Sequence, residues 1–194
     1  MEEICSLLGS NNVLSDGFDA IGFSQGGQIL RAYVQRCNNP PVRNLITIGA
    51  QHQGVMNLPG CLPDASQSEY EKEMTRELRL AQAFFPPEPE EVMAGGCSWW
   101  QRMIKKNIYS DFVQQHIVQA QYFKDPARFE EYLAKNIFLA DINNEREEKK
   151  PEYAKRLSSL KSFVMYMFTN DTQLIPRETS VSNAFQLSPL MMLE

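Results

Sequence analysis

The 194-residue chain has few histidines, no dense basic segment and no long apolar run. Its only histidines are His52 and His116, and its four cysteines include no Cys-x-x-Cys spacing, so the usual donors of a zinc site are missing. A formal net charge of -5 without a basic patch argues against nucleic-acid binding as the main function. No apolar run is long enough to cross a bilayer. We therefore expect no metal, no nucleic-acid partner and no transmembrane segment.

The first residues carry no secretory signal, because MEEICSLLGSNNV begins with acidic residues and its apolar stretch is short. Taken alone, this start indicates a cytosolic protein. The even number of cysteines (Cys5, Cys37, Cys61 and Cys97) fits two disulfides and an oxidising compartment instead. Buried thiols fit a chain of this length equally well, so composition leaves the compartment open.

The pattern of apolar residues predicts an α/β domain built on a mostly parallel sheet. A short apolar run at residues 18–23 lies between turn residues and is typical of a buried strand. A helical pattern follows over 26–35, and a second strand is predicted over 44–48. Strand, helix and strand joined by short turns form a right-handed βαβ unit. The sequence also predicts a helix over 2–8.

The region 59–151 is rich in helical patterns and predicts a helical insertion between sheet strands of one domain that spans residues 1–194. The next strand is predicted only at 162–168. We expect helices in and directly after the insertion over 69–84, 98–121, 126–136 and 151–160. Residues 181–194 show no clear period, and the sequence predicts no element there.

The segment GFSQG, residues 22–26, matches the G-x-S-x-G nucleophile elbow, with a strand before it and a helix after it. We expect Ser24 to occupy strained backbone, so Gly22 and Gly26 are needed because bulky neighbours would clash. The N-terminal amides and dipole of the following helix favour negative charge beside Ser24. The backbone N–H of Gln25 is then placed to donate to an oxyanion. A simple glycine-rich turn is the alternative, but the flanking elements favour a catalytic serine.

A serine nucleophile needs a base, usually histidine, and a carboxylate, in the order Ser, Asp or Glu, His in this fold. Asp171 follows the strand at 162–168, where the acid is expected, although a solvated turn aspartate is the alternative. No histidine follows Asp171. For His52 and His116 a structural role is favoured over that of general base. Covalent chemistry by Ser24 without a base should be severely impaired.

Five segments together resemble the palmitoyl-protein thioesterases, a family of lysosomal α/β-hydrolases, and in particular its type 1 members. In family order they are GFSQGGQ with LRAYVQRC (22–37), NLITIGAQHQGV (44–55), LPGC (58–61), IFLADIN with the following ER (137–146) and FVMYMFTNDT (163–172). The resemblance implies a partial α/β-hydrolase fold truncated at both ends. The family's first strands, N-terminal oxyanion loop and Gly-Asp-His segment have no counterpart in this sequence.

The resemblance implies hydrolysis of long-chain fatty acyl thioesters on protein cysteines, without a cofactor. Ser24 matches the nucleophile, Asp171 the catalytic acid and Gln25 the residue whose N–H binds the oxyanion. S-acylated proteins or peptides are the implied partners, and the acyl chain is expected in the insertion 59–151. Its candidate lining residues, for which plain packing is the alternative, are Leu78, Leu80, Phe84, Phe85, Trp99 and Trp100. Without the family's histidine, we expect these 194 residues alone to be inactive or severely impaired.

The resemblance also implies two disulfides, Cys5–Cys37 and Cys61–Cys97, and a lysosomal or secreted location. Asn170-Asp171-Thr172 is an N-glycosylation sequon, so Asn170 is a candidate for a glycan. Two other functions remain open. One is a non-catalytic product that binds acylated protein or lipid without turnover, and the weaker one is a different esterase or lipase on the same fold.

Overall fold

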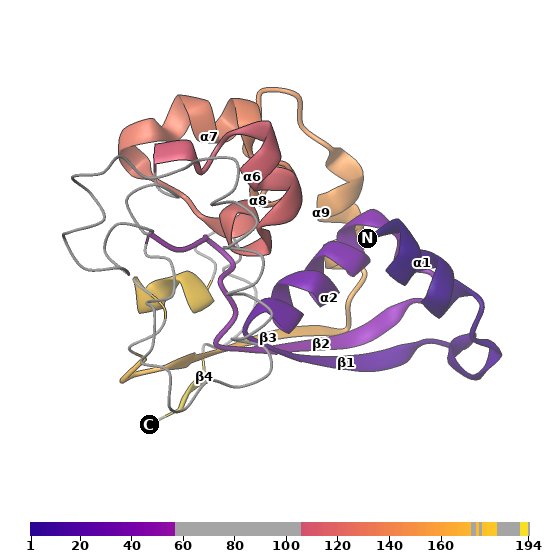
Figure 1. The fold of residues 1–194 in the computed structure, drawn as a ribbon. Coiled ribbons are helices and arrows are strands. Elements are labelled where there is room, and N and C mark those ends of the chain that lie inside the picture. Colours follow the sequence, from indigo (N-terminus) through magenta and orange to yellow (C-terminus); the bar gives the residue numbers. More distant parts are fainter. Residues whose placement is uncertain (57–105, 172–173, 175, 182–190, 194) are drawn as a thin grey trace, which may run out of the picture. The chain divides into compact units, whose positions relative to one another are not determined.

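The chain divides into two compact units, Met1–Met56 with Leu139–Glu194, and Asn57–Phe138. The computed structural model describes residues 1–56, 106–171, 174, 176–181 and 191–193 (Figure 1). The first unit contains the sheet and the predicted elbow. Residues 139–151, which the sequence assigned to the insertion, belong to this sheet unit.

In the described residues, four parallel strands form one sheet in the order β1-β2-β3-β4. Strand β1 (Phe18–Phe23) pairs with β2 (Val42–Ile48), β2 with β3 (Ser162–Phe168), and β3 with the short β4 (Met191–Leu193). The predicted α/β class with a mostly parallel sheet is therefore confirmed. Strand β4 was not predicted, because three residues are too few for a period to show.

Helix α2 (Gln25–Arg36) connects β1 to β2 and covers one face of the sheet (Figure 1). It contacts β1, β2 and helix α9 (Pro151–Ser158). A hydrophobic core cluster formed by these elements consists of the buried residues Ala20, Tyr33, Val34, Val42, Leu45 and Leu157. All members of this cluster except Leu157 belong to the βαβ unit predicted from the apolar pattern.

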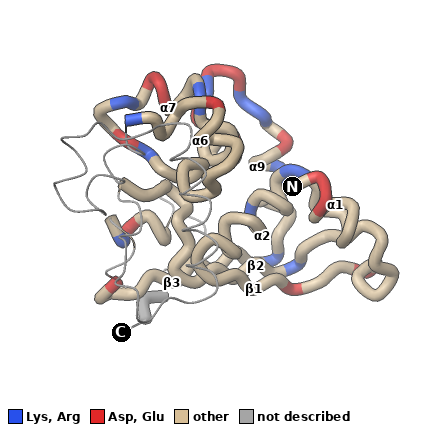
Figure 2. Tube along the Cα trace, viewed as in Figure 1, with Lys and Arg blue, Asp and Glu red and all other residues tan. Residues whose placement is uncertain are grey.

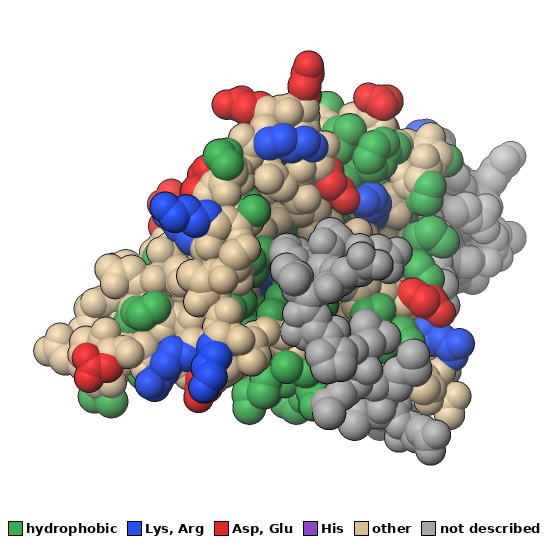
Figure 3. Space-filling view, turned by 180° about the vertical axis from the view of Figure 1, so that it is seen from behind, with side chains coloured by type: hydrophobic (Ala, Val, Ile, Leu, Met, Phe, Trp, Pro, Cys, Tyr) green, Lys and Arg blue, Asp and Glu red, His purple; other side chains and the backbone are tan. Residues whose placement is uncertain are grey.

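Strand β1 is an edge of the sheet in the described part of the chain. Its side chains alternate, so that Ala20 is buried whereas Ile21 and Phe23 are exposed. Apolar side chains also reach the surface on the face that Figure 3 shows. The charged residues of α1 are both acidic, whereas α9 carries residues of both signs (Figure 2).

In the second unit, the prediction of a single helix over 98–121 is wrong for residues 106–121, the part that the structure describes. Helix α6 covers only Asp111–His116, and Ile117 is extended before a 3₁₀ helix, Val118–Tyr122. Ser110 caps α6 by accepting from the N–H of Val113. The buried Gln114 amide donates to the carbonyls of Ile108 and Ala120, so a side chain takes the place of continued helical hydrogen bonds.

The predicted helix over 126–136 is present as a 3₁₀ turn, Pro126–Arg128, followed by α7 (Phe129–Lys135). The predicted helix over 69–84 lies outside the described residues, as do the six candidate residues of the acyl groove.

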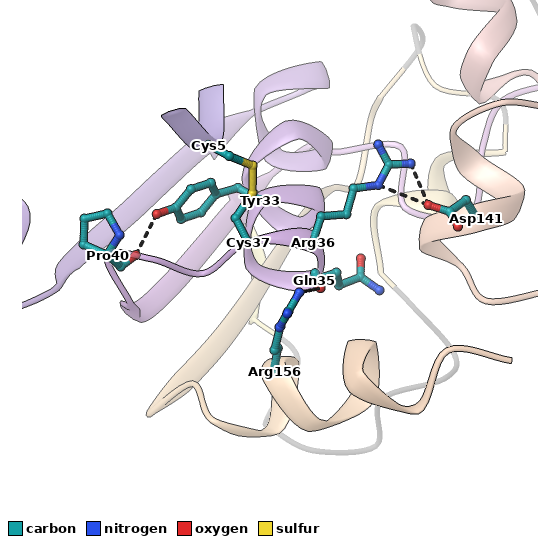
Figure 4. The surroundings of a disulfide bond; sticks show 8 residues. All are labelled: Cys5, Tyr33, Gln35, Arg36, Cys37, Pro40, Asp141 and Arg156. Atoms are coloured by element: carbon teal, nitrogen blue, oxygen red, sulfur yellow. Dashed lines mark hydrogen bonds and ion pairs between the residues drawn. A yellow bond between two sulfur atoms is a disulfide. The ribbon is translucent and has the colours of Figure 1, made fainter. Parts of the chain in front are cut away.

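Helix α1 (Glu2–Gly9) is joined to the end of α2 by a disulfide between Cys5 and Cys37, with 6.0 Å between their Cα atoms (Figure 4). No residue of α1 is fully buried, and Ile4 and Leu8 are only partly buried against the core. The disulfide is therefore a main attachment of this helix. Cys61 and Cys97 lie outside the described residues, so their pairing stays a prediction.

A buried carboxylate ties α2 to the segment that leads into α9. Asp141, in α8 (Leu139–Ile142), accepts a hydrogen bond from Arg36 at 2.6 Å (Figure 4). It also accepts hydrogen bonds from Lys150 and from the Tyr153 hydroxyl, the latter at 2.9 Å. Burial alone would raise the pKa of Asp141, but the hydrogen bonds from Lys150, Arg36 and Tyr153 outweigh it and lower that pKa. The carboxylate stays ionised and fixes the end of α2.

Substitution Asp141→Asn should lower the free energy of unfolding by about 2 kcal/mol near neutral pH. We place the effect below that of a fully buried pair because the Arg36 and Lys150 side chains are 25% and 46% exposed and can turn to water. The folded-state pKa of Asp141 is depressed, so its contribution is present above the unfolded-state pKa of about 3.9 and is lost as pH falls through the folded-state pKa.

Urea unfolding of both proteins at several pH values, from neutral to about pH 2, measures this difference. The difference in the free energy of unfolding between wild type and Asp141→Asn should vanish at the lowest pH values. The control is Asp111→Asn, which breaks an exposed pair with Lys135 and should cost less than about 1 kcal/mol. A difference that stays constant down to the lowest pH would contradict the stabilising role of the ionised Asp141.

Candidate active site

Ser24 lies between β1 and α2 with φ 48° and ψ -125°. Positive φ is uncommon for a residue other than glycine, and such strain is often found at functional sites. The Ser24 N–H donates to the Ile48 carbonyl at 2.9 Å, and the Ser24 carbonyl accepts from the N–H of Gly27 at 3.0 Å. The neighbouring strand and the first turn of α2 therefore hold this backbone, while the side chain is exposed.

Two glycines make the tight turn possible, but they are not the two that the motif names. A Cβ on Gly22 would lie 2.6 Å from the nitrogen of Gly27, and a Cβ on Gly27 would lie 2.6 Å from the Cβ of Ala50. A Cβ on Gly26 would meet no atom within 4 Å. The expectation that Gly26 is needed for steric reasons is therefore wrong. The helix approaches the sheet at Gly27, one residue beyond the motif.

Gln25 is the first residue of α2, one residue earlier than the predicted start of that helix. Its backbone follows Ser24 directly, at the end of the helix where amide groups and the dipole favour negative charge. This position suits the role of oxyanion donor that we propose for its N–H.

Asp171 follows β3 in a turn at the same edge of the sheet. Its N–H donates to the Phe168 carbonyl at 3.3 Å, and its Oδ1 accepts from the N–H of Leu174 at 3.0 Å. Gly49, with φ 57°, directly follows β2, the strand between β1 and β3, and its N–H donates to the Tyr166 carbonyl. A Cβ on Gly49 would lie 3.2 Å from the Phe168 ring and 3.9 Å from Asp171 Oδ2.

Ser24 and Asp171 are thus separated by one strand, whose end carries no side chain at Gly49. At the usual spacing of parallel strands, the ends of β1 and β3 lie about 10 Å apart. The sheet therefore brings the two predicted residues to one edge, on either side of β2.

The two histidines have other partners. His52 is fully buried, its Nε2 lies 2.8 Å from Thr47 Oγ1, and its ring packs edge-on against Phe163. Burial, together with the nearby charge of Arg31, lowers the pKa of His52 well below its usual value, so the ring stays neutral. His116 stacks on Phe112 and its Nδ1 contacts the Phe112 carbonyl within α6.

A residue that the sequence reasoning missed, Gln51, touches Ser24. It lies in the loop after β2, and its Nε2 donates to Ser24 Oγ at 3.2 Å. The available signal was its place in NLITIGAQHQGV, a segment that follows a strand at the catalytic edge. An amide carries no charge and has no motif of its own, so residue type alone did not single it out.

Within the described residues, no group of three or more His, Cys, Asp or Glu side chains could hold a metal ion. No helix in the described part of the chain is long and apolar enough to cross a membrane. Asn170, the asparagine of the sequon, is exposed.

A family model for palmitoyl protein thioesterase matches residues 1–190. The chain is 39% identical over 176 residues to palmitoyl-protein thioesterase 1 of Caenorhabditis elegans, covering 91% of this chain and 49% of that protein. It is 32% identical over 179 residues to palmitoyl-protein thioesterase 3 of Dictyostelium discoideum, covering 92% and 50%. It is 31% identical over 177 residues to the palmitoyl-protein thioesterase-dolichyl pyrophosphate phosphatase fusion 1 of Schizosaccharomyces pombe, covering 91% and 24%.

The chain thus spans half or less of the length of these relatives. Among solved structures, MenH from S. aureus is similar with a TM-score of 0.38 and 16% identity, over 99% of this chain and 65% of that one, and the fold assignment does not depend on it. The match of the family model over nearly the whole sequence, with an elbow serine at the end of β1, settles the relationship: the chain belongs to the palmitoyl protein thioesterase family.

Proposed function

We propose that this chain carries the nucleophile and the acid of a palmitoyl-protein thioesterase, a serine hydrolase that removes long-chain fatty acyl groups from protein cysteine thioesters. The observation that carries the proposal is the strained Ser24 at the start of α2, at the same sheet edge as Asp171. Family membership supports the substrate class, S-acylated proteins or peptides.

In the proposed reaction, Ser24 Oγ attacks the acyl carbonyl carbon and its proton passes to a base. The Gln25 N–H stabilises the oxyanion that forms. The C–S bond then breaks, and the cysteine leaves as a thiolate, which needs little acid assistance because a thiol pKa is about 8.5. Water next attacks the acyl-serine and releases the fatty acid. Asp171 would orient the base and stabilise its protonated form.

The base is the part for which this sequence offers no candidate at the site. No histidine follows Asp171, and His52 is directed toward Thr47 in the core. We therefore propose that hydrolysis by these 194 residues alone is severely impaired and that an added base restores part of it. General base catalysis contributes about 10²- to 10⁴-fold, which sets the size of the deficit.

Three further assignments rest on family membership. We propose that residues 59–151 hold the acyl chain, that the protein is lysosomal or secreted, and that its second disulfide joins Cys61 to Cys97. A glycan on Asn170 is compatible with the exposure of that side chain, which lies beside the proposed acid.

The test is hydrolysis of a palmitoyl thioester of a cysteine peptide, with and without added imidazole, by wild type and by Ser24→Ala. Imidazole should raise the wild-type rate by about 10-fold over Ser24→Ala, since it replaces part of a general base. The rate measured with the Ser24→Ala protein is the background from direct attack of imidazole on the thioester, and it is subtracted from the wild-type rate. Mass spectrometry should find a palmitoyl group on Ser24 of the wild type only.

Equal rates for the two proteins at every imidazole concentration would overturn the catalytic proposal. If both also bound the palmitoyl peptide with the same affinity, the result would favour the non-catalytic binder. Turnover without any added base would instead overturn the proposal that these residues are impaired.

A further inference from the structure

We propose that Gln51 is a positioning residue for the nucleophile: its side-chain amide holds the Ser24 hydroxyl so that the hydroxyl proton faces a base. This inference rests on the proposed function of Ser24. Its starting point is the hydrogen bond from Gln51 Nε2 to Ser24 Oγ, at 3.2 Å. The described residues place no other side-chain donor on that oxygen.

The Gln51 side chain comes from a loop that is held on two sides. Its backbone carbonyl accepts from the buried Gln28 side chain, on the first turns of α2, and from the N–H of Gly54 at 3.0 Å. The next part of the loop is held by Thr179, whose Oγ1 accepts from the N–H of Gln53 at 3.0 Å and donates to the Gly54 carbonyl at 2.6 Å. Gln51 itself is only 5% exposed.

The amide orientation follows from the donors and acceptors. With Nε2 toward Ser24, the one buried Gln51 side-chain atom without a hydrogen-bond partner is Oε1. The reverse orientation would bury the two N–H groups of the amide without partners, which costs more than one unpaired acceptor. Gln51 therefore donates and Ser24 Oγ accepts, so the serine O–H points away from Gln51.

This arrangement has a consequence for reactivity. Ser24 is exposed, so without Gln51 its hydroxyl would sample the staggered rotamers freely. A donor on Oγ selects one of them and also favours the negative charge that develops when the proton leaves. Loss of one such hydrogen bond corresponds to a rate decrease of about 10-fold.

The experiment compares Gln51→Met, which keeps the shape but has no donor, with Gln51→Glu, whose carboxyl donates only when protonated. The rate of Ser24 modification by a long-chain alkyl fluorophosphonate, in fixed imidazole, is followed by intact mass from acid to neutral pH. Gln51→Met should react about 10-fold more slowly than wild type at every pH. Gln51→Glu should be equally slow near neutral pH and approach the wild-type rate as the carboxyl protonates.

The matched control is Gln35→Met, which removes a buried amide that donates to the Ile142 carbonyl from α2. Gln35 is 3% exposed, comparable to Gln51, so both variants disturb a buried amide, but only one faces Ser24. Gln35→Met should react at the wild-type rate. A purely structural role for Gln51 would produce no recovery of Gln51→Glu at acid pH. A Gln51→Glu protein faster than wild type near neutral pH would overturn the donor assignment, since the carboxylate would then be acting on the serine proton.

Nuclear magnetic resonance of the ¹⁵N-labelled chain separates this inference from the proposed function. Substitution Ser24→Ala should shift the side-chain NH₂ signals of Gln51 and leave those of Gln35 in place. Unchanged Gln51 signals would overturn the inference even if Ser24 reacts. If the wild type is not modified at any imidazole concentration, the proposed function fails, while the NH₂ signals still decide whether Gln51 holds the hydroxyl. If Gln51→Met does not fold, Gln51→Glu carries the kinetic test.

Discussion

Removal of the Cys5–Cys37 disulfide, by the double substitution Cys5→Ala and Cys37→Ala, is expected to lower the free energy of unfolding by about 4 kcal/mol. The bond closes a loop with a sequence separation of 32, and the chain-entropy model gives this magnitude for a loop of that length. Helix α1 has no fully buried residue, so little else compensates for the lost crosslink.

Urea unfolding under non-reducing conditions measures the effect, and amide hydrogen exchange shows where it acts. Exchange in α1 should quicken in the double variant more than exchange in β2, which is paired on both sides. A reductant should lower the urea midpoint of the wild type. Any lowering that it still causes in the double variant must come from a disulfide between the remaining cysteines, Cys61 and Cys97. The same midpoint for wild type and double variant would rule out this disulfide in the folded protein.

Substitution Gly22→Ala is expected to cost about 3 kcal/mol, whereas Gly26→Ala should stabilise the protein by about 1 kcal/mol. A Cβ on Gly22 would press on the backbone nitrogen and Cα of Gly27, at 2.6 and 2.7 Å, and backbone atoms cannot swing aside as a side chain can. A Cβ on Gly26 enters open space on a helix, where alanine is favoured over glycine.

The two glycines form a matched pair, since both belong to the G-x-S-x-G pattern and both receive one methyl group. Urea midpoints of the two variants and the wild type give the comparison. If the motif as a whole demanded glycine, both substitutions would destabilise by similar amounts. That outcome would contradict the contacts that distinguish the two positions.

The elements that sequence patterns predicted well are those with long or strongly apolar periods. Strands β1 and β3 were predicted with their observed bounds, and α2 was predicted to within one residue at each end. Strand β2 begins two residues earlier than predicted because Val42 is already paired with Phe18. Each of these segments buries one face against the sheet or α2. Burial of one face requires apolar residues at a regular spacing, and that spacing is visible in the sequence.

The features that were missed depend on contacts between segments distant in the sequence. The pattern could not assign the steric demand to Gly27 rather than Gly26, because the demand comes from Ala50 after the next strand. Likewise, Gln51 acts on a serine that lies 27 residues earlier. The break after α6 depends on Gln114, whose amide binds two carbonyls outside that helix. A local window contains none of these partners.

The direct pairing of β2 with β3 has an evolutionary consequence, because the whole second unit lies in the connection between them. The entropy of closing such a connection rises only logarithmically, by about 0.6 kcal/mol for each doubling of its length. The connection can therefore lengthen, shorten or be replaced at little thermodynamic cost to the sheet. Selection on the region proposed to hold the acyl chain can proceed while the strands keep Ser24 and Asp171 at one edge.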